Sequence, residues 1–305
     1  MAKIKAKKSK LFKNQKRTVF ALIAFSFILI YAISLVAPLV WTVFSSFKSD
    51  IAFAKDPFGW YNPKLGGFMP QNYVNTFKYI YVNPINSDRR ILLVEMFVNS
   101  LVWAVGSTVV AEFTRSCCAY VVARFRHRHK WVGHIYSLVL ILMLVSFPSN
   151  LQVGIEFNEL CGLYDNMFMK VLSAISFSSP HFLYLYAAYV GVSHEYSEAA
   201  RIDGAGQFTV MFKIIMPMIK NIFLALCVLT FILQWNDYTI SYVFLPSYPV
   251  VAHGLFNIQN APVGEATKVP NQLAACTLVI VPTLIIFIIF KDQMIGNLAI
   301  GGLKG

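Results

Sequence analysis

Residues 19–44 read VFALIAFSFILIYAISLVAPLVWTVF and contain no charged side chain. A bilayer core requires about 20 consecutive apolar residues per helix, so this stretch is long enough to cross a membrane. The basic residues before it are also typical of a signal peptide. The apolar run is much longer than that of a signal peptide, however, and no small-residue cleavage site follows it. We therefore expect a retained transmembrane helix at residues 19–44.

The composition of the chain is that of a polytopic membrane protein. Of its 305 residues, 57% are hydrophobic and only 13% are charged, whereas a soluble globular chain carries about 25% charged residues. The net charge of +12 comes from basic residues that cluster between long apolar runs rather than over a binding face. This pattern excludes a soluble enzyme, a DNA-binding domain and a disordered chain.

Six apolar segments are long enough to be transmembrane helices. They cover residues 19–44, 97–122, 131–147, 171–192, 222–245 and 273–290. Each must satisfy its own backbone hydrogen bonds in lipid, so the fold class is all-α with six transmembrane helices. Pro38 and Pro180 interrupt two of these runs, and we expect kinks there.

The distribution of Lys and Arg predicts the orientation of these helices. Basic residues gather in the N-terminal tail (residues 1–18), in the connections 123–130 and 193–220, and in the C-terminal tail (residues 291–305). The connections 148–170 and 246–272 carry acidic residues instead. By the positive-inside rule, both termini are cytoplasmic and flank a transmembrane domain over residues 19–290.

The sequence contains no catalytic or metal-binding motif. The five cysteines form no CxxC or Cys/His spacing of a metal site. The chain has no GxxxxGK[ST] phosphate-binding loop, so it is not itself a P-loop ATPase. We expect no enzyme activity, no metal site and no cofactor bound by this chain.

The connection between the fourth and fifth segments differs from an ordinary polar loop. Residues 193–217 read SHEYSEAARIDGAGQFTVMFKIIMP and mix charged, small and apolar side chains. Ser197 predicts the start of a short helix that ends in a left-handed cap at Gly204. A second helix from about Thr209 would end or bend at Pro217.

This second helix would have an apolar edge. Its members recur at helical spacing and are Phe208, Met211, Phe212 and Ile215. We predict that this edge is exposed to the cytoplasm, where it would serve as a docking surface.

The spacing within this loop resembles the EAA loop of ABC importer permeases. The matching positions are Glu198-Ala199-Ala200, Gly204, Ile214 and Met216-Pro217, with Met216 where the family usually has Leu. Arg201 to Ala205 has the form typical of carbohydrate importers of the maltose-permease MalG-like group. Shorter stretches near the second and fifth segments and the C-terminal tail agree, so the resemblance covers nearly the whole chain.

The resemblance implies a type I ABC importer fold and a permease subunit that moves a sugar or oligosaccharide by alternating access. Its implied partners are a second permease, a dimer of ATP-binding-cassette ATPases that hydrolyse the ATP, and an external solute-binding protein. Residues that would couple this chain to the ATPase are Glu198, Ala199, Ala200, Asp203, Gly204, Ala205 and Pro217. Glu198 would make the polar contact, the two alanines would permit close approach, and Pro217 would transmit motion to the fifth segment.

Candidate residues of the substrate path are polar or aromatic side chains inside the apolar segments. They are Asn99, Trp235, Asn236 and Asp237. Trp235 could instead anchor a helix at the membrane interface, and Asn99 could make a helix–helix hydrogen bond.

Two further polar groups within the spans favour structural roles. Glu112 and Arg115 lie on one helix face, which favours a structural ion pair over substrate contact. His181 is expected to be a packed residue that is bonded to a neighbouring helix.

Two alternatives to a sugar importer permease remain open at this point. One is a secondary transporter driven by an ion gradient, which would require inverted repeats and buried carboxylates for ion coupling. We see only Glu112 as a carboxylate for such a role, and no repeat is evident. The other alternative is an ABC importer for a solute that is not a sugar, because such importers share the EAA loop.

Overall fold

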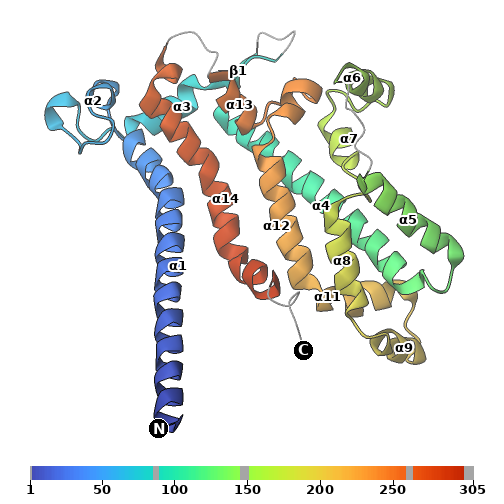
Figure 1. The fold of residues 1–305 in the computed structure, drawn as a ribbon. Coiled ribbons are helices and arrows are strands. Elements are labelled where there is room, and N and C mark those ends of the chain that lie inside the picture. Colours follow the sequence, from blue (N-terminus) through green and yellow to red (C-terminus); the bar gives the residue numbers. More distant parts are fainter. Residues whose placement is uncertain (1, 85–88, 145–150, 259–263, 299–305) are drawn as a thin grey trace. The chain divides into compact units, whose positions relative to one another are not determined.

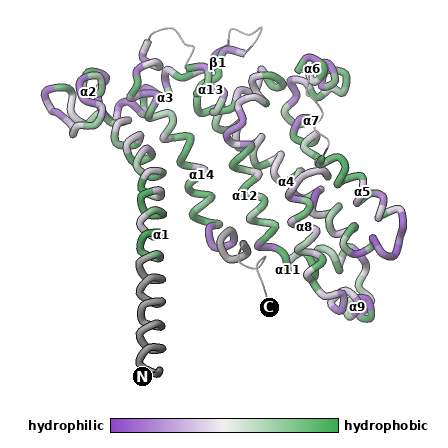
Figure 2. The backbone as a smooth tube through the Cα atoms, viewed as in Figure 1, coloured by the Kyte–Doolittle hydropathy of each residue, from purple (hydrophilic) through white to green (hydrophobic). Residues whose placement is uncertain are grey.

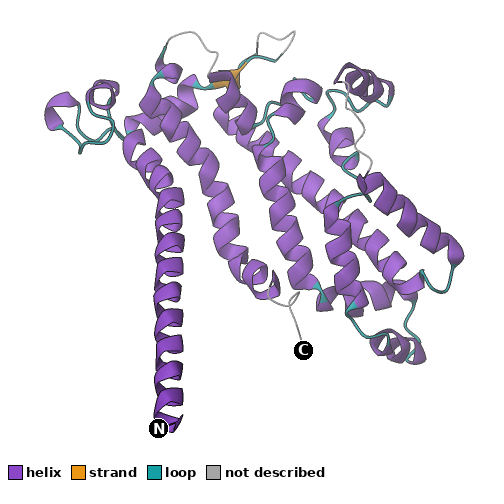
Figure 3. Ribbon diagram, viewed as in Figure 1, coloured by secondary structure: helices purple, strands orange, loops and turns teal. Residues whose placement is uncertain are grey.

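The computed structural model describes residues 2–84, 89–144, 151–258 and 264–298, and almost all of its regular structure is helical (Figures 1 and 3). A short antiparallel sheet pairs β1 (Tyr81–Val82) with β2 (Ile91–Leu92). The contacts divide the chain into two compact units, residues 1–74 with 268–277 and residues 75–267 with 278–305.

The first unit consists mainly of one long helix and a compact segment of short helices and turns that follows it. Its elements are α1 (Ala2–Ser46), α2 (Asp50–Lys55), the 3₁₀ turn η1 (Pro63–Leu65), and the first residues of α3 (Gln71–Tyr79) and α14 (Val269–Leu298). The helix α1 continues through Pro38. In its apolar part no residue from Phe20 to Phe44 is buried by the rest of the chain, as in a lipid-facing helix, whereas Ser45 and Ser46 at the end of α1 are buried.

Hydrogen bonds to main-chain carbonyls hold this compact segment together. The Lys48 side chain is 1% exposed, and its Nζ donates to the carbonyls of Asp56 and Pro57 at 3.0 and 2.9 Å. The Asn72 amide donates to the carbonyls of Ser46 and Lys48, both at 2.7 Å. These buried donors fix the chain where it leaves α1.

The second unit is a helical bundle centred on α4. Its elements are α4 (Leu93–Phe125), α5 (Lys130–Leu144), α6 (Leu151–Leu160), α7 (Met167–Leu172), α8 (Pro180–Val190), α9 (Glu195–Ile202), α10 (Gln207–Thr209), the π-helix η2 (Val210–Ile215), α11 (Met216–Met218), α12 (Lys220–Asn236), the π-helix η3 (Ile240–Phe244), α13 (Val251–Ile258) and the 3₁₀ turn η4 (Glu265–Thr267). The most extensive helix–helix packing is that of α4 against α8 and α12.

Three helices of the described chain are long and apolar enough to cross a membrane. They are Phe20–Ser46, Leu93–Phe125 and Val269–Gln293. A fourth span results if Gln207–Met218 and Lys220–Asn236, which meet at 79°, are counted as one. Figure 2 shows the hydrophobic residues along α4, α12, α14 and the described part of α1. Segments 131–147 and 171–192 correspond to shorter helices, so the count of six remains a prediction.

Two expected spans differ from the structure. Residues 171–192 do not form one kinked helix, because α7 ends at Leu172 and α8 starts afresh at Pro180. Ser179 caps α8 by accepting from the His181 amide at 3.3 Å, and Pro180 takes the first-turn position that proline favours. Residues 222–245 also divide, because α12 ends at Asn236. Residues 145–147 of the third segment lie outside the described chain.

Gly106 allows α4 and α7 to approach closely. A Cβ added at Gly106 would lie 2.8 Å from Val171 Cγ1, and a β-branched side chain cannot easily turn away. We expect Gly106→Ala to destabilise the chain by about 1–3 kcal/mol through overpacking. Thermal unfolding in detergent would measure this loss.

A matched pair of variants tests the origin of this effect. Gly133 in α5 has nothing within 4 Å of an added Cβ, so Gly133→Ala should be neutral or stabilising. Adding Val171→Ala to Gly106→Ala should restore stability. Equal effects at Gly106 and Gly133 would contradict the close-packing explanation.

His253 makes the stability of the folded chain depend on pH. It lies in α13, outside the apolar spans, is 5% exposed, and has Nδ1 3.2 Å from Ser241 Oγ. Burial lowers the pKa of His253 from 6.5 to about 4. The folded chain therefore binds this proton less readily than the unfolded chain, and protonation favours unfolding. The contribution of His253 to stability is complete above about pH 6.5 and falls as the pH drops toward 4.

Between pH 7 and pH 5 we expect this group to reduce the free energy of unfolding by about 2 kcal/mol. Unfolding curves of the purified chain at the two pH values would measure the loss. His253→Asn should have a shallower pH dependence than the wild type. An unchanged pH dependence in that variant would show that other groups are responsible.

Candidate functional site

The helix α9 and the turn after it form the tip of the loop at residues 193–220, which we call the coupling loop because the sequence predicts that role for it. The Ala205 amide donates to the Ala200 carbonyl at 2.9 Å, and the Gly204 amide donates to the Arg201 carbonyl at 3.0 Å. This pair of bonds is a Schellman motif, which requires a left-handed residue after the helix. Gly204 has φ of +81°, as expected from the sequence. The Arg201 guanidinium also donates to Gln207 Oε1 at 3.1 Å and closes the turn.

The start of this helix was not correctly predicted. The helix α9 begins at Glu195, two residues before Ser197, and the Ser197 side chain is buried within it. Ser197 Oγ has no hydrogen-bond partner among the described residues, so it caps nothing. Glu195 and Glu198 instead place negative charge in the first turn, where it interacts favourably with the helix dipole.

The second arm of the loop combines three short pieces of helix. It runs from Gln207 to Met218 and contains the π-helix η2, in which the Met216 amide donates to the Met211 carbonyl. Pro217 does not end this arm, because the helical chain continues to Met218. The bend of 79° into α12 comes at Ile219, whose side chain is buried.

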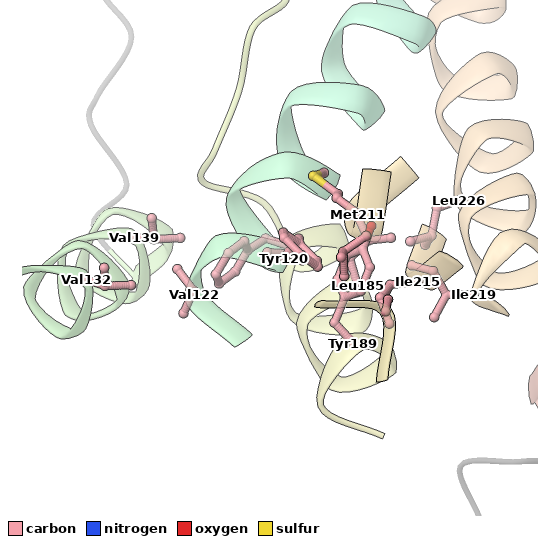
Figure 4. Packing of buried hydrophobic residues seen from close by; sticks show 14 residues of the cluster. Tyr120, Val122, Val132, Val139, Leu185, Tyr189, Met211, Ile215, Ile219 and Leu226 are labelled. Carbon is pink, nitrogen blue, oxygen red and sulfur yellow. The ribbon is translucent and has the colours of Figure 1, made fainter. Parts of the chain in front are cut away.

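The apolar edge of the loop is only partly exposed. Met211 and Ile215 are buried in the core of the bundle beside Tyr120 and Tyr189 (Figure 4), which corrects the expectation that they face the cytoplasm. Phe212 is half-buried and stacks on Phe113 with ring centroids 5.8 Å apart.

The most exposed large apolar side chains of this tip are Ile202, at 86%, and Phe208, at 80%. Ile202 precedes the turn at Gly204, and Phe208 follows it. Two large apolar side chains at the tip of a loop are unfavourable in water and indicate a binding surface. Figure 1 shows α9 at the end of the bundle where α8 ends and α11 begins.

The predicted coupling residues divide between this surface and the core. Those at the surface are Glu198, Ala199, Asp203, Gly204 and Pro217. Ala200 is 7% exposed and belongs to the core, and Ala205 packs against the same core. The small side chain of Ala200 therefore permits close approach of α9 to its own bundle, which corrects its expected position at a partner surface.

The candidate substrate-path residues do not converge. Trp235 is 1% exposed, stacks on Phe231, and donates from Nε1 to the Val279 carbonyl at 3.0 Å, so it presents no free face for a sugar. Asn236 is exposed, and its amide donates to the Ile232 carbonyl of its own helix at 2.8 Å.

The other two candidates take part in local structure. Asp237 accepts from the Thr239 amide at 2.9 Å and shapes the end of α12. The Asn99 amide donates to the Pro249 carbonyl at 3.1 Å and holds the segment before α13 against α4. Asn236 is the candidate of these four whose side chain is exposed.

A buried polar cluster lies within the bundle. The expected ion pair between Glu112 and Arg115 is present, and His181 bonds to a neighbouring helix through its Nδ1, 2.7 Å from Glu112 Oε1. Thr230 in α12 joins them by donating to Glu112 Oε1 at 2.6 Å. Thr230 was not predicted from the sequence. The one signal that could have indicated it is a single hydroxyl side chain within an apolar run. Among the described residues, no group of three or more His, Cys, Asp or Glu is placed to hold a metal ion.

Comparison with known proteins relates this arrangement to membrane transport. The profile of the family "Binding-protein-dependent transport system inner membrane component" matches residues 116–295, which include the coupling loop. A diacetylchitobiose uptake system permease protein of Streptomyces coelicolor is 24% identical over 287 residues, covering 92% of this chain and 88% of that protein. A galactooligosaccharides transport system permease protein of Bacillus subtilis is 27% identical, covering 95% and 98%.

A solved structure has the same fold. It is a crystal structure of a bacterial ABC transporter involved in the import of the acidic polysaccharide alginate. One of its chains aligns with a TM-score of 0.67 and 18% identity, and covers 90% of this chain and 96% of that chain. Since the family profile spans more than half of the residues, the chain belongs to the binding-protein-dependent transport system inner membrane components.

Proposed function

We propose that this chain is a permease subunit of an ATP-binding-cassette importer that brings a sugar or oligosaccharide into the cell. Family membership makes it a multi-pass inner-membrane subunit and not an enzyme, and it implies ATPase and solute-binding partners. The observation that carries the sugar assignment is the agreement of several relatives, which are named for diacetylchitobiose, galactooligosaccharides and multiple sugars and match along 89–95% of this chain.

The coupling loop supplies the mechanical part of this proposal. Its tip exposes Ile202 and Phe208 on either side of the Gly204 turn, which hydrogen bonds hold in place, so an ATPase would bind a preformed surface. Glu198 and Asp203 add exposed negative charge beside these apolar side chains. Closure of the ATPases on ATP would move this tip, and α12 would carry the motion into the membrane.

The membrane arrangement that we propose follows the positive-inside rule. Six spans within residues 19–290 place the coupling loop and both tails, residues 1–18 and 291–305, in the cytoplasm. The substrate path would form between this chain and a second permease, with Asn236 as a contributing side chain. ATP would be bound and hydrolysed by the separate ATPase subunits, and this chain would hold no cofactor or metal.

Uptake by the complete importer tests the proposal. The chain and the subunits that co-purify with it are reconstituted in proteoliposomes and offered labelled diacetylchitobiose, raffinose, a galactooligosaccharide and the amino acid glutamine. We expect uptake of at least one oligosaccharide that requires internal ATP and is insensitive to ionophores. Uptake of glutamine alone would contradict the sugar assignment. Uptake that ionophores abolish and that needs no ATP would favour an ion-driven transporter.

A further inference from the structure

Glu112 bonds simultaneously to two other helices in the middle of the bundle. Its side chain lies in α4 and is 0% exposed. Glu112 Oε1 accepts from Thr230 Oγ1 of α12 at 2.6 Å and lies 2.7 Å from His181 Nδ1 of α8. Thr230 Oγ1 and His181 Nδ1 are themselves 3.3 Å apart, so the three side chains meet at one point.

The charge of Glu112 is compensated locally. Arg115, one turn further along α4, forms an ion pair with the same oxygen. The carboxylate also lies beside His181 in the first turn of α8, where the helix dipole favours negative charge. Its other oxygen, Oε2, is buried and has no hydrogen-bond partner among the described residues. Burying a carboxylate without a partner costs free energy, so removing one of these contacts would be unfavourable.

The two helices that Glu112 joins are those that enter and leave the coupling loop. The helix α8 ends at Val190, a few residues before α9, and α12 begins at Lys220, directly after the second arm. Another polar contact of α4, Ser116 Oγ to Tyr189 Oη at 2.7 Å, reaches α8 alone. Glu112 therefore differs from Ser116 in bonding to both of the helices that flank the loop.

We propose that Glu112 is a positioning residue that holds α8 and α12 against α4. The two helices would then move together, as a rigid unit, when the coupling loop moves. The inference rests on the proposed function, because it assigns a part in coupling to a group far from the loop tip. Its donors and charge partner are all within this chain, which sets the cluster apart from a substrate site. Without the bond to Thr230, α12 could shift along α4 while α8 stays in place.

Variants that each remove one hydrogen bond of the cluster test this role of Glu112. Thr230→Val keeps the shape of the side chain but removes its donor to Glu112, and Thr230→Ser retains that donor. Ser116→Ala is the matched control, since it removes a single buried hydroxyl that bonds only α8. Spin labels on cysteines at the exposed positions 196 in α9 and 229 in α12 would report the distance between loop tip and helix. The five native cysteines are replaced by alanine in all samples.

The distance is measured by pulsed electron resonance in the complete importer, without nucleotide and with ATP and vanadate. We expect the same narrow distance in both states for the wild type, Ser116→Ala and Thr230→Ser. Thr230→Val should shift or widen it by about 2 Å, the size of helix displacement common in switching proteins. If Thr230→Val does not assemble, His181→Phe cuts the bond to α8 and carries the same expectation.

Two results would overturn the inference. In one, Thr230→Val has the wild-type distance in both states. In the other, the wild-type distance itself changes with ATP and vanadate, so that loop and helix do not move together. Oligosaccharide uptake by the same vesicles keeps the two proposals apart. A wild-type importer that preserves the distance but takes up no sugar contradicts the proposed function and leaves the fastening role of Glu112 standing.

Discussion

Replacement of Ile202 and Phe208 by aspartate is expected to release the ATPase from this chain. The two side chains are 86% and 80% exposed, so charge at these positions costs the fold of the isolated chain little. In a complex they would be buried apolar anchors, and losing such an anchor costs about 2 kcal/mol or more. A loss of this size weakens binding roughly 30-fold for each position.

Co-purification of the ATPase with the Ile202→Asp/Phe208→Asp variant measures the effect. We expect the variant to insert and elute as a single species with little ATPase, and to lose oligosaccharide uptake. Trp60→Asp is the matched control, because Trp60 is 83% exposed but lies in the first unit, outside the coupling loop. Retention of the ATPase by the double variant would show that it docks elsewhere.

The sequence predicted the general character of this chain and the position of the turn at Gly204. Apolar length and the distribution of basic residues require no knowledge of packing, so they identify a membrane protein directly. Gly204 was also predictable, because the left-handed cap of a short helix favours glycine for a local, steric reason. The EAA spacing indicated the permease family, and the family profile confirmed the family, while the coupling role of residues 193–220 stays a prediction.

Features that depend on which neighbour a side chain meets could not be predicted. Lipid and protein interior are both apolar, so periodicity does not tell a lipid-facing side chain from a buried one. Trp235 was therefore a reasonable candidate for a sugar contact, although it is buried and bonded to the Val279 carbonyl. Local propensity likewise does not report that Met211 and Ile215 are buried or that Glu112 meets Thr230, because both depend on how several helices pack together.

Gly204→Val is expected to uncouple transport from ATP hydrolysis. Gly204 has φ of +81°, a left-handed conformation that costs a residue with a Cβ about 1–2 kcal/mol, and a β-branched side chain fits it worst. To avoid this strain the chain must leave the Schellman turn, which breaks the bonds that set the angle of α9. Uptake per ATP hydrolysed should then fall at least tenfold, while membrane insertion stays normal.

Gly206 provides a strict comparison, since it lies two residues away in the same loop. Both glycines have nothing within 4 Å of an added Cβ, but Gly206 has φ of −70°, which valine adopts freely. Gly206→Val should therefore transport nearly as the wild type does, and Gly204→Asn should retain most activity because asparagine tolerates the left-handed region. Equal loss at the two positions would mean that bulk at the docking surface, rather than the backbone conformation of Gly204, is what the importer cannot accept.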